Sequence, residues 1–247
     1  MVPISLMPWG SQVVFGQPTP GSPGIENLRS TVILDWDASW TEEIAALAGP
    51  VSVADVSGLQ RLHQVIATNV RGVYAFQETQ PASVTWTRRR GSCSQRLAIL
   101  ESTARAVGIP TNVRGVWVDG RFWYPRFHAL RIAIPDRVLL AWPSFHIESA
   151  WLSASELFGT VGSLATARPA GFTNKGETVF DALSTTAIDW DGQTATQPGC
   201  ACDLSSRVLI DLGYFDSRDE LFATNGQTLC APARVLAGQM LGRRIVA

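Results

Sequence analysis

The sequence predicts an α+β fold in which helices lead into an antiparallel sheet. Apolar residues recur at helical spacing over residues 40 to 75 and again over residues 93 to 107. Three runs between residues 111 and 142 are instead dense in β-branched and aromatic side chains, with Asp-Gly and Pro-Asp breaks between them. Helices followed by a three-stranded meander therefore form the expected framework.

Composition limits the possible functions. The chain has 247 residues, of which 46% are hydrophobic, and a net charge of −1, so it has a large core and no charge excess typical of a general nucleic-acid or membrane-surface binder. The amino terminus lacks the pattern of a signal peptide, and no apolar run approaches the ~20 residues of a membrane span. Four cysteines in a chain of this length do not indicate a disulfide framework. We expect a cytoplasmic protein with free thiols.

The amino-terminal third divides into an irregular arm and two helices. Residues 1 to 30 are rich in proline and glycine, and "TVILDW" (residues 31 to 36) is a short strand candidate. Gly49 and Pro50 separate two helical patterns, "SWTEEIAALAG" and "ADVSGLQRLHQVIATNVRGVYAF". No internal repeat or linker is evident, so residues 1 to 247 are expected to form one domain.

The remaining elements follow a helix that begins near residue 93. The three strand candidates are "TNVRGVWV" (111 to 118), "FHALRIAI" (127 to 134) and "RVLLAW" (137 to 142). Beyond residue 150 the pattern is mixed and mainly helical, broken by glycine- and proline-containing stretches. We expect this extension to close over a pocket.

Cys93 occupies a special place at the start of its helix. With Ser92 as N-cap, Gln95 falls at the third helical position, which completes a Ser-x-x-Gln capping box and makes Cys93 the first helical residue. Unpaired backbone amides and the positive end of the helix dipole favour a thiolate there. Gly108 and Pro110 end the helix, and its buried face is predicted to hold Leu97, Leu100, Ala104 and Val107. The alternative is a buried structural cysteine, but the cap favours a nucleophile.

A cysteine nucleophile in acyl chemistry needs an imidazole within reach. The chain has three histidines. His63 lies inside an upstream apolar helix pattern and His146 lies past the third strand, whereas His128 opens the second strand. His128 is therefore the predicted partner of Cys93.

The order of these motifs resembles a known superfamily. "GSCSQRLAILESTARAVGIPTNVRGVWV" followed by "HALRI" is similar to the transglutaminase-like pattern of G-x-C, an alanine- and leucine-rich helix, R-A-x-G-I-P and a His-Ala strand. The resemblance covers residues 86 to 145. It implies a transglutaminase-like (papain-like) catalytic core, with the nucleophile helix packed on an antiparallel sheet between amino-terminal helices and a carboxy-terminal extension.

The sequence departs from that superfamily at the acid that orients the histidine. The usual Asp-Pro is replaced by Trp142 and Pro143, and tryptophan cannot accept the imidazole N–H. Asp119 is the best substitute. A tight Asp-Gly hairpin would put it some 25–30 Å from His128, whereas a loop over residues 119 to 126, which Pro125 and the crowded aromatic residues favour, would make the two neighbours. Further candidates are Asp136, Glu148 and His146.

With this departure, "RRGSCSQR", "VWVDGRFWYPRF" and "RVLLAWPSF" resemble the transglutaminase-like Dieckmann cyclases, which close tetramate and pyridone rings in polyketide–peptide natural products. The resemblance implies a catalytic set of Cys93, His128 and Asp119. It also implies a β-ketoacyl-aminoacyl substrate, delivered as a phosphopantetheine thioester on a carrier protein and released by C–C ring closure to a tetramic acid or a related pyridone precursor. No cofactor is expected.

Other residues are candidates for binding. A dry substrate pocket is expected to be lined by Trp117, Phe122, Trp123, Tyr124, Phe127 and Trp142. Arg88, Arg89 and Arg90 form either a solvated face or a contact for the phosphopantetheine phosphate and an acidic carrier surface. No metal site is expected, because the remaining cysteines lack the usual zinc spacing; they are Cys200, Cys202 and Cys230.

Two other functions remain open at the sequence level. A transglutaminase-like cysteine peptidase or amidase would use Cys93 and His128 on a peptide bond, in an open polar groove, with release by water. A non-catalytic transglutaminase-like binding module would explain the lost Asp-Pro aspartate, although the retained Cys, His and capping box argue against it.

Overall fold

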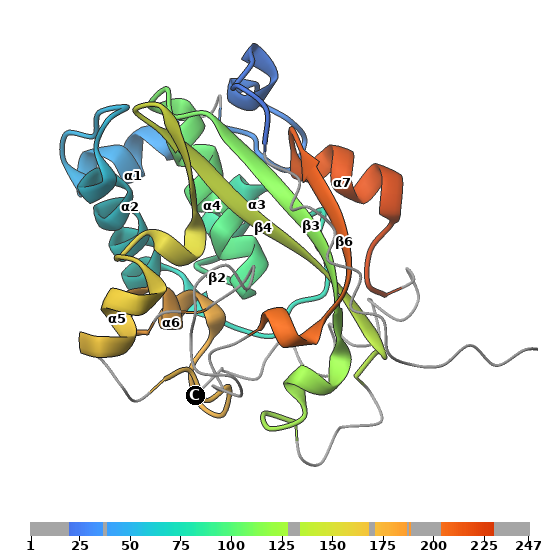
Figure 1. Cartoon of the computed structure of the whole chain (residues 1–247). Helices are drawn as coiled ribbons and strands as arrows, with labels where there is room; N and C mark the ends of the chain where they lie inside the picture. The colour runs from blue at the N-terminus through green and yellow to red at the C-terminus, as the bar shows by residue number, and fades with distance from the viewer. Residues whose placement is uncertain are drawn as a thin grey trace, which may run out of the picture.

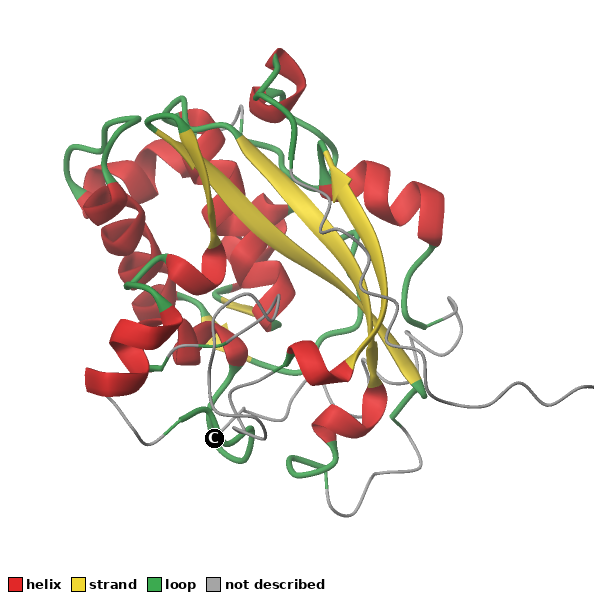
Figure 2. Ribbon diagram, viewed as in Figure 1, coloured by secondary structure: helices red, strands yellow, loops and turns green. Residues whose placement is uncertain are grey.

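The computed structural model describes residues 20–36, 39–127, 134–167, 171–186, 188 and 204–229. The fold is α+β, as predicted, and is built on a four-stranded antiparallel sheet in the order β5-β4-β3-β6 (Figure 1). The strands are β3 (Thr111–Asp119), β4 (Arg137–Ile147), β5 (Ala150–Ser153) and β6 (Val208–Phe215). β3 and β4 are the two long central strands (Figure 2).

Four helices precede the sheet and gather on one side of it, whereas α7 lies beside the β6 edge (Figure 1). The helices are α1 (Trp40–Ala48), α2 (Val56–Asn69), α3 (Ala82–Arg88), α4 (Cys93–Ala106), α5 (Val161–Ala167), α6 (Val179–Thr185) and α7 (Arg218–Asn225). Short 3-10 turns are η1 (Ile25–Leu28), η2 (Gly120–Trp123), η4 (Ala154–Glu156) and η5 (Ser205–Arg207). The two helices predicted between residues 40 and 75 are confirmed as α1 and α2.

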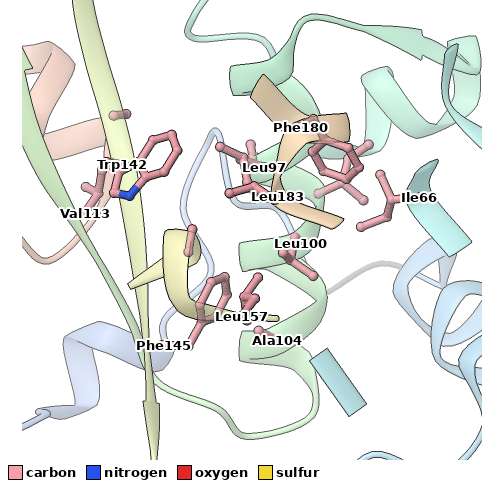
Figure 3. Packing of buried hydrophobic residues seen from close by; sticks show 14 of the residues in the cluster. Ile66, Leu97, Leu100, Ala104, Val113, Trp142, Phe145, Leu157, Phe180 and Leu183 are labelled. Carbon is pink, nitrogen blue, oxygen red and sulfur yellow. The ribbon is translucent and has the colours of Figure 1, made fainter. Parts of the chain in front are cut away.

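Helix α4 is the centre of the core. Leu97, Leu100 and Ala104 lie between the sheet on one side and α2 and α6 on the other (Figure 3). Burial extends beyond the single predicted face to every residue of α4 from Gln95 to Arg105. The expectation of one buried face was therefore too narrow, because elements pack around the whole helix and the polar groups along it are buried with their partners.

The connection between β3 and β4 differs from the predicted meander. The two strands pair directly along their length, from Thr111↔Phe145 to Asp119↔Arg137. This pairing leaves no place between them for residues 127 to 134, so the meander order was wrong; residues 128–133 lie outside the described part of the chain. The chain leaves the sheet because Asp119 caps η2, and the Gly120 N–H then donates to the Asp136 carbonyl at 2.8 Å.

Two further elements were mispredicted. Residues 31 to 36 form turns rather than a strand, because the Asp219 carboxylate of α7 accepts from the Ile33 N–H (3.2 Å) and the Thr31 hydroxyl (2.5 Å). The apolar character of this segment reflects burial of Ile33 and Leu34. Conversely, β6 was not predicted, and it places part of the carboxy-terminal extension at the edge of the sheet.

A parallel ladder of two residue pairs lies directly before helix α4, which begins at Cys93. β1 (Arg71–Gly72) pairs with β2 (Arg90–Gly91). The Val73 N–H donates to the Gly91 carbonyl at 3.0 Å, so the segment after β1 runs past the start of α4. None of the described helices is long and apolar enough to cross a membrane.

Candidate active site

The start of α4 holds Cys93 as the sequence predicts. The Gln95 N–H donates to the Ser92 hydroxyl (3.2 Å), and the Ser92 N–H donates to Gln95 Oε1 (3.0 Å). This reciprocal capping box makes Cys93 the first helical residue. Within the described part of the chain, the backbone N–H groups of Cys93 and Ser94 have no acceptor, as is usual for a first helical turn. Two donors are therefore available beside the thiol.

Gly91 allows this helix start to pack closely. A Cβ at this position would lie 2.5 Å from Thr85 Cγ2 and 3.2 Å from Gln95 Cβ. The first distance is shorter than real Cβ contacts, so any larger residue would push α3 and α4 apart. The glycine of the G-x-C motif therefore reflects the close approach of two helices.

The half-buried thiol of Cys93 opens into a cavity of about 160 Å³. The wall is mainly apolar, and four aromatic side chains contribute to it. The described lining residues are Val73, Tyr74, Ala75, Phe76, Glu78, Ser92, Cys93, Ser94, Trp123, Arg126, Phe127, Ile134, Pro135, Val138, Leu140 and Thr228. Such a wall suits an apolar ligand held at a few polar points.

Segments distant in sequence build this wall. The Gln95 amide Nε2 donates to the Gln77 carbonyl (2.9 Å), so the capping residue also holds the segment 73–78. Gln227 accepts from the Glu78 N–H (3.1 Å), and the Thr228 hydroxyl accepts from the Leu139 N–H (3.0 Å). The carboxy-terminal extension thus reaches the cavity through Thr228.

Glu78 introduces a carboxyl group beside the thiol. Loss of hydration raises the pKa of this carboxyl, against the opposing effects of a hydrogen bond with Ser94 and the charge of Arg218. Arg218 donates to Ser94 Oγ (2.8 Å) and to Glu101 Oε1 (2.7 Å), so a polar chain runs from the core to the cavity. Sequence reasoning missed Glu78, whose place depends on the β1–β2 ladder.

The predicted aromatic residues divide into two groups. Trp123 and Phe127 line the cavity. Trp117, Tyr124 and Trp142 are not among its lining residues: Trp142 is buried and donates to Ser153 Oγ (3.1 Å), and Trp117 lies near the Arg137 guanidinium.

Phe122 is also absent from the lining and packs edge-on against Trp123. Tyr74 and Phe76 were not predicted as lining residues, because "GVYAF" was placed at the end of the second helical pattern, whereas α2 ends at Asn69. The ladder that turns this stretch toward Cys93 has only two residues on each side and no distinct sequence pattern.

Two of the three histidines lie away from the cavity. His63 is buried against the rings of Phe180 (4.0 Å) and Phe158 (5.3 Å), and burial lowers its pKa to about 4. His146 donates its N–H to the Pro110 carbonyl, beyond the far end of α4. That helix has 14 residues and a length of about 20 Å. His128 lies outside the described residues, and the described residues nearest to it in sequence, Phe127 and Ile134, both line the cavity.

Asp119 ends β3 and starts a loop. The two-residue hairpin is excluded, because η2 and a turn follow Asp119, so the loop alternative is confirmed, with the strand ending one residue later than predicted. The buried carboxylate accepts from the Arg121 N–H (2.9 Å) and its guanidinium (2.6 Å). Hydrogen bonding to Arg121 holds the pKa of Asp119 below its usual value. Asp119 is not among the cavity-lining residues, and its predicted contact with His128 lies outside the described part.

The three arginines before Cys93 are exposed. Arg88 donates to Gln80 Oε1 (2.8 Å), and Arg89 pairs with Glu43 (2.9 Å) while stacking on Trp86. The Trp86 indole N–H donates to the same Glu43, and both polar atoms of the Gln95 side chain are engaged as described above.

The described residues contain no group of three side chains that could hold a metal ion. Cys200, Cys202 and Cys230 lie outside the described residues. Comparisons with protein-family models, with curated proteins and with solved structures found no match. The functional argument therefore depends on the residues and geometry of this site.

Proposed function

We propose that this protein is a cytoplasmic Dieckmann cyclase with a transglutaminase-like catalytic core. Its substrate would be a β-ketoacyl-aminoacyl chain carried as a phosphopantetheine thioester, and its product a tetramic acid or a related pyridone precursor. The main support is the position of the Cys93 thiol, at the first residue of a capped, buried helix and open to an apolar cavity. A nucleophile and a dry compartment for an acyl chain thus lie together.

In the first step, the Cys93 thiolate attacks the aminoacyl carbonyl of the thioester. The new C–S bond to Cys93 forms, the C–S bond to the carrier breaks, and the carrier thiol leaves with the proton that the histidine base took from the Cys93 thiol. The unpartnered N–H groups of Cys93 and Ser94 are suited to stabilise the oxyanion of the tetrahedral intermediate.

His128 is the proposed base. His63 and His146 lie away from the cavity, as described above, whereas His128 directly follows the cavity-lining Phe127. The covalent link to Phe127 is the observation that favours His128 over the other two histidines. The buried carboxylate of Asp119 would hold one imidazole tautomer.

Ring closure follows from the acidity of the substrate. His128 removes a proton from the carbon between the β-keto and amide carbonyls, and the resulting enolate carbon attacks the acyl carbonyl on Cys93. A C–C bond forms, the C–S bond breaks, and the Cys93 thiolate is restored. Water takes no part, so an apolar wall favours cyclisation over hydrolysis.

The carrier would approach over the exposed Arg88, Arg89 and Arg90, which precede the nucleophile. Arginine suits contacts with a phosphate or an acidic surface. Arg88 and Arg89 already have protein partners, so the carrier would have to exchange these contacts for its own.

Thiol release from a synthetic β-ketoacyl-aminoacyl thioester tests the nucleophile and the base. We expect Cys93→Ser to abolish catalytic thiol release and His128→Gln to lower it by about 10²-fold or more. His146→Gln is the matched control and should retain the wild-type rate, because His146 lies beyond the far end of α4. Equal losses in both histidine variants would remove the support for His128.

Asp119→Asn tests the orienting carboxylate. We expect kcat to fall while the thermal midpoint changes little, since Asn still caps η2. The exposed Glu42→Gln is the control, and Asp136→Asn tests the alternative acid named from the sequence. An unchanged kcat in Asp119→Asn would reduce the catalytic set to Cys93 and His128.

A further inference from the structure

Arg126 is a cation in the wall of the Cys93 cavity, and it forms no ion pair within the described part of the chain. Its Nε and Nη2 atoms are buried, and neither has a hydrogen-bond partner among the described residues. The backbone is fixed nearby, because the Arg126 N–H donates to the Trp123 carbonyl at 3.0 Å. Two guanidinium nitrogens are thus left with their donors unused.

Tyr74 connects Arg126 to the nucleophile. The Arg126 guanidinium carbon lies 6.0 Å from the centre of the Tyr74 ring, and Tyr74 lines the same cavity. Burial raises the pKa of the Tyr74 hydroxyl; the positive charge of Arg126 opposes this effect and the thiol of Cys93 adds to it. Tyr74, Arg126 and Cys93 all line the same cavity.

The Arg126 side chain is half-buried, and leaving two of its buried donors without partners is costly for folding. Burial of a charge without a partner removes hydration that nothing replaces, and buried donors are rarely left unsatisfied. Such groups are expected where a ligand supplies the missing acceptor. The two buried nitrogens of Arg126 can each donate an N–H, a geometry that suits two neighbouring, coplanar oxygen atoms.

We propose that Arg126 binds the two oxygens of the substrate's 1,3-dicarbonyl group and stabilises the enolate formed from it. This inference rests on the proposed cyclase function. In a five-membered ring closure the enolate carbon must reach the carbonyl attached to Cys93, so both oxygens lie near the sulfur. Arg126 and Cys93 line one cavity of about 160 Å³, which matches that requirement.

The phosphate of the carrier's phosphopantetheine is a less suitable partner. It lies at the opposite end of the pantetheine arm from the thioester, whereas Arg126 shares a cavity with the thiol that attacks that thioester. The enolate carries a single charge spread over two oxygens.

The chemical consequence concerns the second half of the reaction. Arg126 donates to the β-keto and amide oxygens while the base removes the proton between them, so the developing negative charge meets a fixed cation. No interaction of Arg126 with the thioester carbonyl is required. Loss of the guanidinium should therefore slow ring closure and spare the formation of the acyl-enzyme.

The kinetic test uses an N-acetylcysteamine thioester of a β-ketoacyl-amino acid, which has no phosphate. Single-turnover experiments follow thiol release, acyl-enzyme by intact mass, and cyclised product. We expect Arg126→Met to keep the rate of the first thiol release within a few-fold, to lower ring closure about 10²- to 10³-fold, and to accumulate acyl-enzyme. Arg126→Lys should recover only part of the lost rate of ring closure, because lysine keeps the charge but lacks the planar pair of N–H donors of a guanidinium. The exposed Arg71→Met is the matched control.

A binding test is independent of turnover. The probe is a synthetic 3-acyltetramic acid, an anionic 1,3-dicarbonyl, added to the Cys93→Ala protein in the presence of a chelator. We expect the further change Arg126→Met to weaken binding by about 10- to 100-fold, the range for hydrogen bonds to a charged group. Thermal unfolding of Arg126→Met should occur at the wild-type temperature or above, because two buried donors without partners are removed.

The outcomes separate this inference from the proposed function. If the wild-type protein does not cyclise the thioester, the cyclase function fails together with the inference. If the wild-type cyclises it and Arg126→Met does so at the same rate, the inference alone is wrong. If Arg126→Met is defective only with a carrier-bound substrate, Arg126 binds the phosphate. If Arg126→Met unfolds at a lower temperature and loses acyl-enzyme formation and ring closure equally, its role is structural.

Discussion

Gly91 and Thr85 control how closely α3 approaches the residues before Cys93. Gly91→Ala would put a methyl group 2.5 Å from Thr85 Cγ2. We expect a loss of about 1–3 kcal/mol in the free energy of unfolding, typical of overpacking, together with lower thiol release.

Thr85→Ser supplies the control for this substitution, since it deletes Cγ2 and keeps the hydroxyl that accepts from Gln80 Nε2. The double variant Gly91→Ala/Thr85→Ser should recover much of both losses, as measured by urea unfolding and thiol release. No recovery would show that the Thr85 contact is not the reason for glycine at this position.

His63 makes stability depend on pH. Its pKa in the folded protein is lowered from 6.5 to about 4 by burial, so the unfolded chain binds more protons between these values. The free energy of unfolding should therefore fall as pH decreases from 6.5 to about 4, by roughly 3 kcal/mol from this residue. His63→Gln retains an N–H donor for the Phe180 carbonyl and should reduce this loss. Urea unfolding at pH 7 and pH 5 measures it; identical losses in both proteins would contradict this account.

For single residues, the sequence predicted contacts between neighbours in the chain but not contacts between residues far apart in sequence. Ser92, Cys93 and Gln95 interact within one helical turn, so their spacing was sufficient to predict the cap. Glu78 and Arg126 line the cavity of Cys93 only through packing between distant segments, which no local pattern encodes.

At the element scale, α4 and the segment 73–78 act together through Gln95. Gln95→Glu keeps an acceptor for the Ser92 N–H but loses the donor to the Gln77 carbonyl. We expect faster hydrogen exchange of amides in residues 73 to 78 and lower activity, with the start of α4 preserved.

Ser92→Ala is the comparison, because it removes a cap bond and should cost about 1 kcal/mol without releasing Gln77. Unchanged exchange over residues 73 to 78 in Gln95→Glu would mean that the β1–β2 ladder alone holds this wall.

Element types were easier to predict than their pairing. The helices α1, α2 and α4 and the strands β3 and β4 have strong periodic or β-branched patterns. The direct β3–β4 pairing was missed because a β-rich run at residues 127 to 134 favoured a meander, and β6 was missed because its pairing with β3 is long-range. Residues 31 to 36 were predicted as a strand, but the Ile33 N–H donates to the Asp219 carboxylate of α7 instead of to a neighbouring strand.

At the scale of the whole molecule, Arg218 joins the carboxy-terminal extension to the nucleophile helix. Its guanidinium is buried and donates to Glu101, Ser94 and the Ala141 carbonyl, which belong to α4 and β4. Arg218→Met leaves the Glu101 carboxylate buried without its cation, and we expect a loss of about 3–5 kcal/mol in the free energy of unfolding.

The double variant Arg218→Met/Glu101→Leu removes both charges and should be more stable than the single variant. Urea unfolding measures all three proteins. A double variant less stable than Arg218→Met would show that the pair contributes through its other hydrogen bonds rather than through charge matching.

The central claim is that acyl transfer to Cys93 ends in ring closure. The most direct measurement is the mass of the product formed from a synthetic β-ketoacyl-aminoacyl thioester by the wild-type protein and by Cys93→Ala. We predict a product one water lighter than the free acid, formed only when Cys93 is present. Release of the free acid by the wild-type protein would instead identify a hydrolase and contradict the cyclase function.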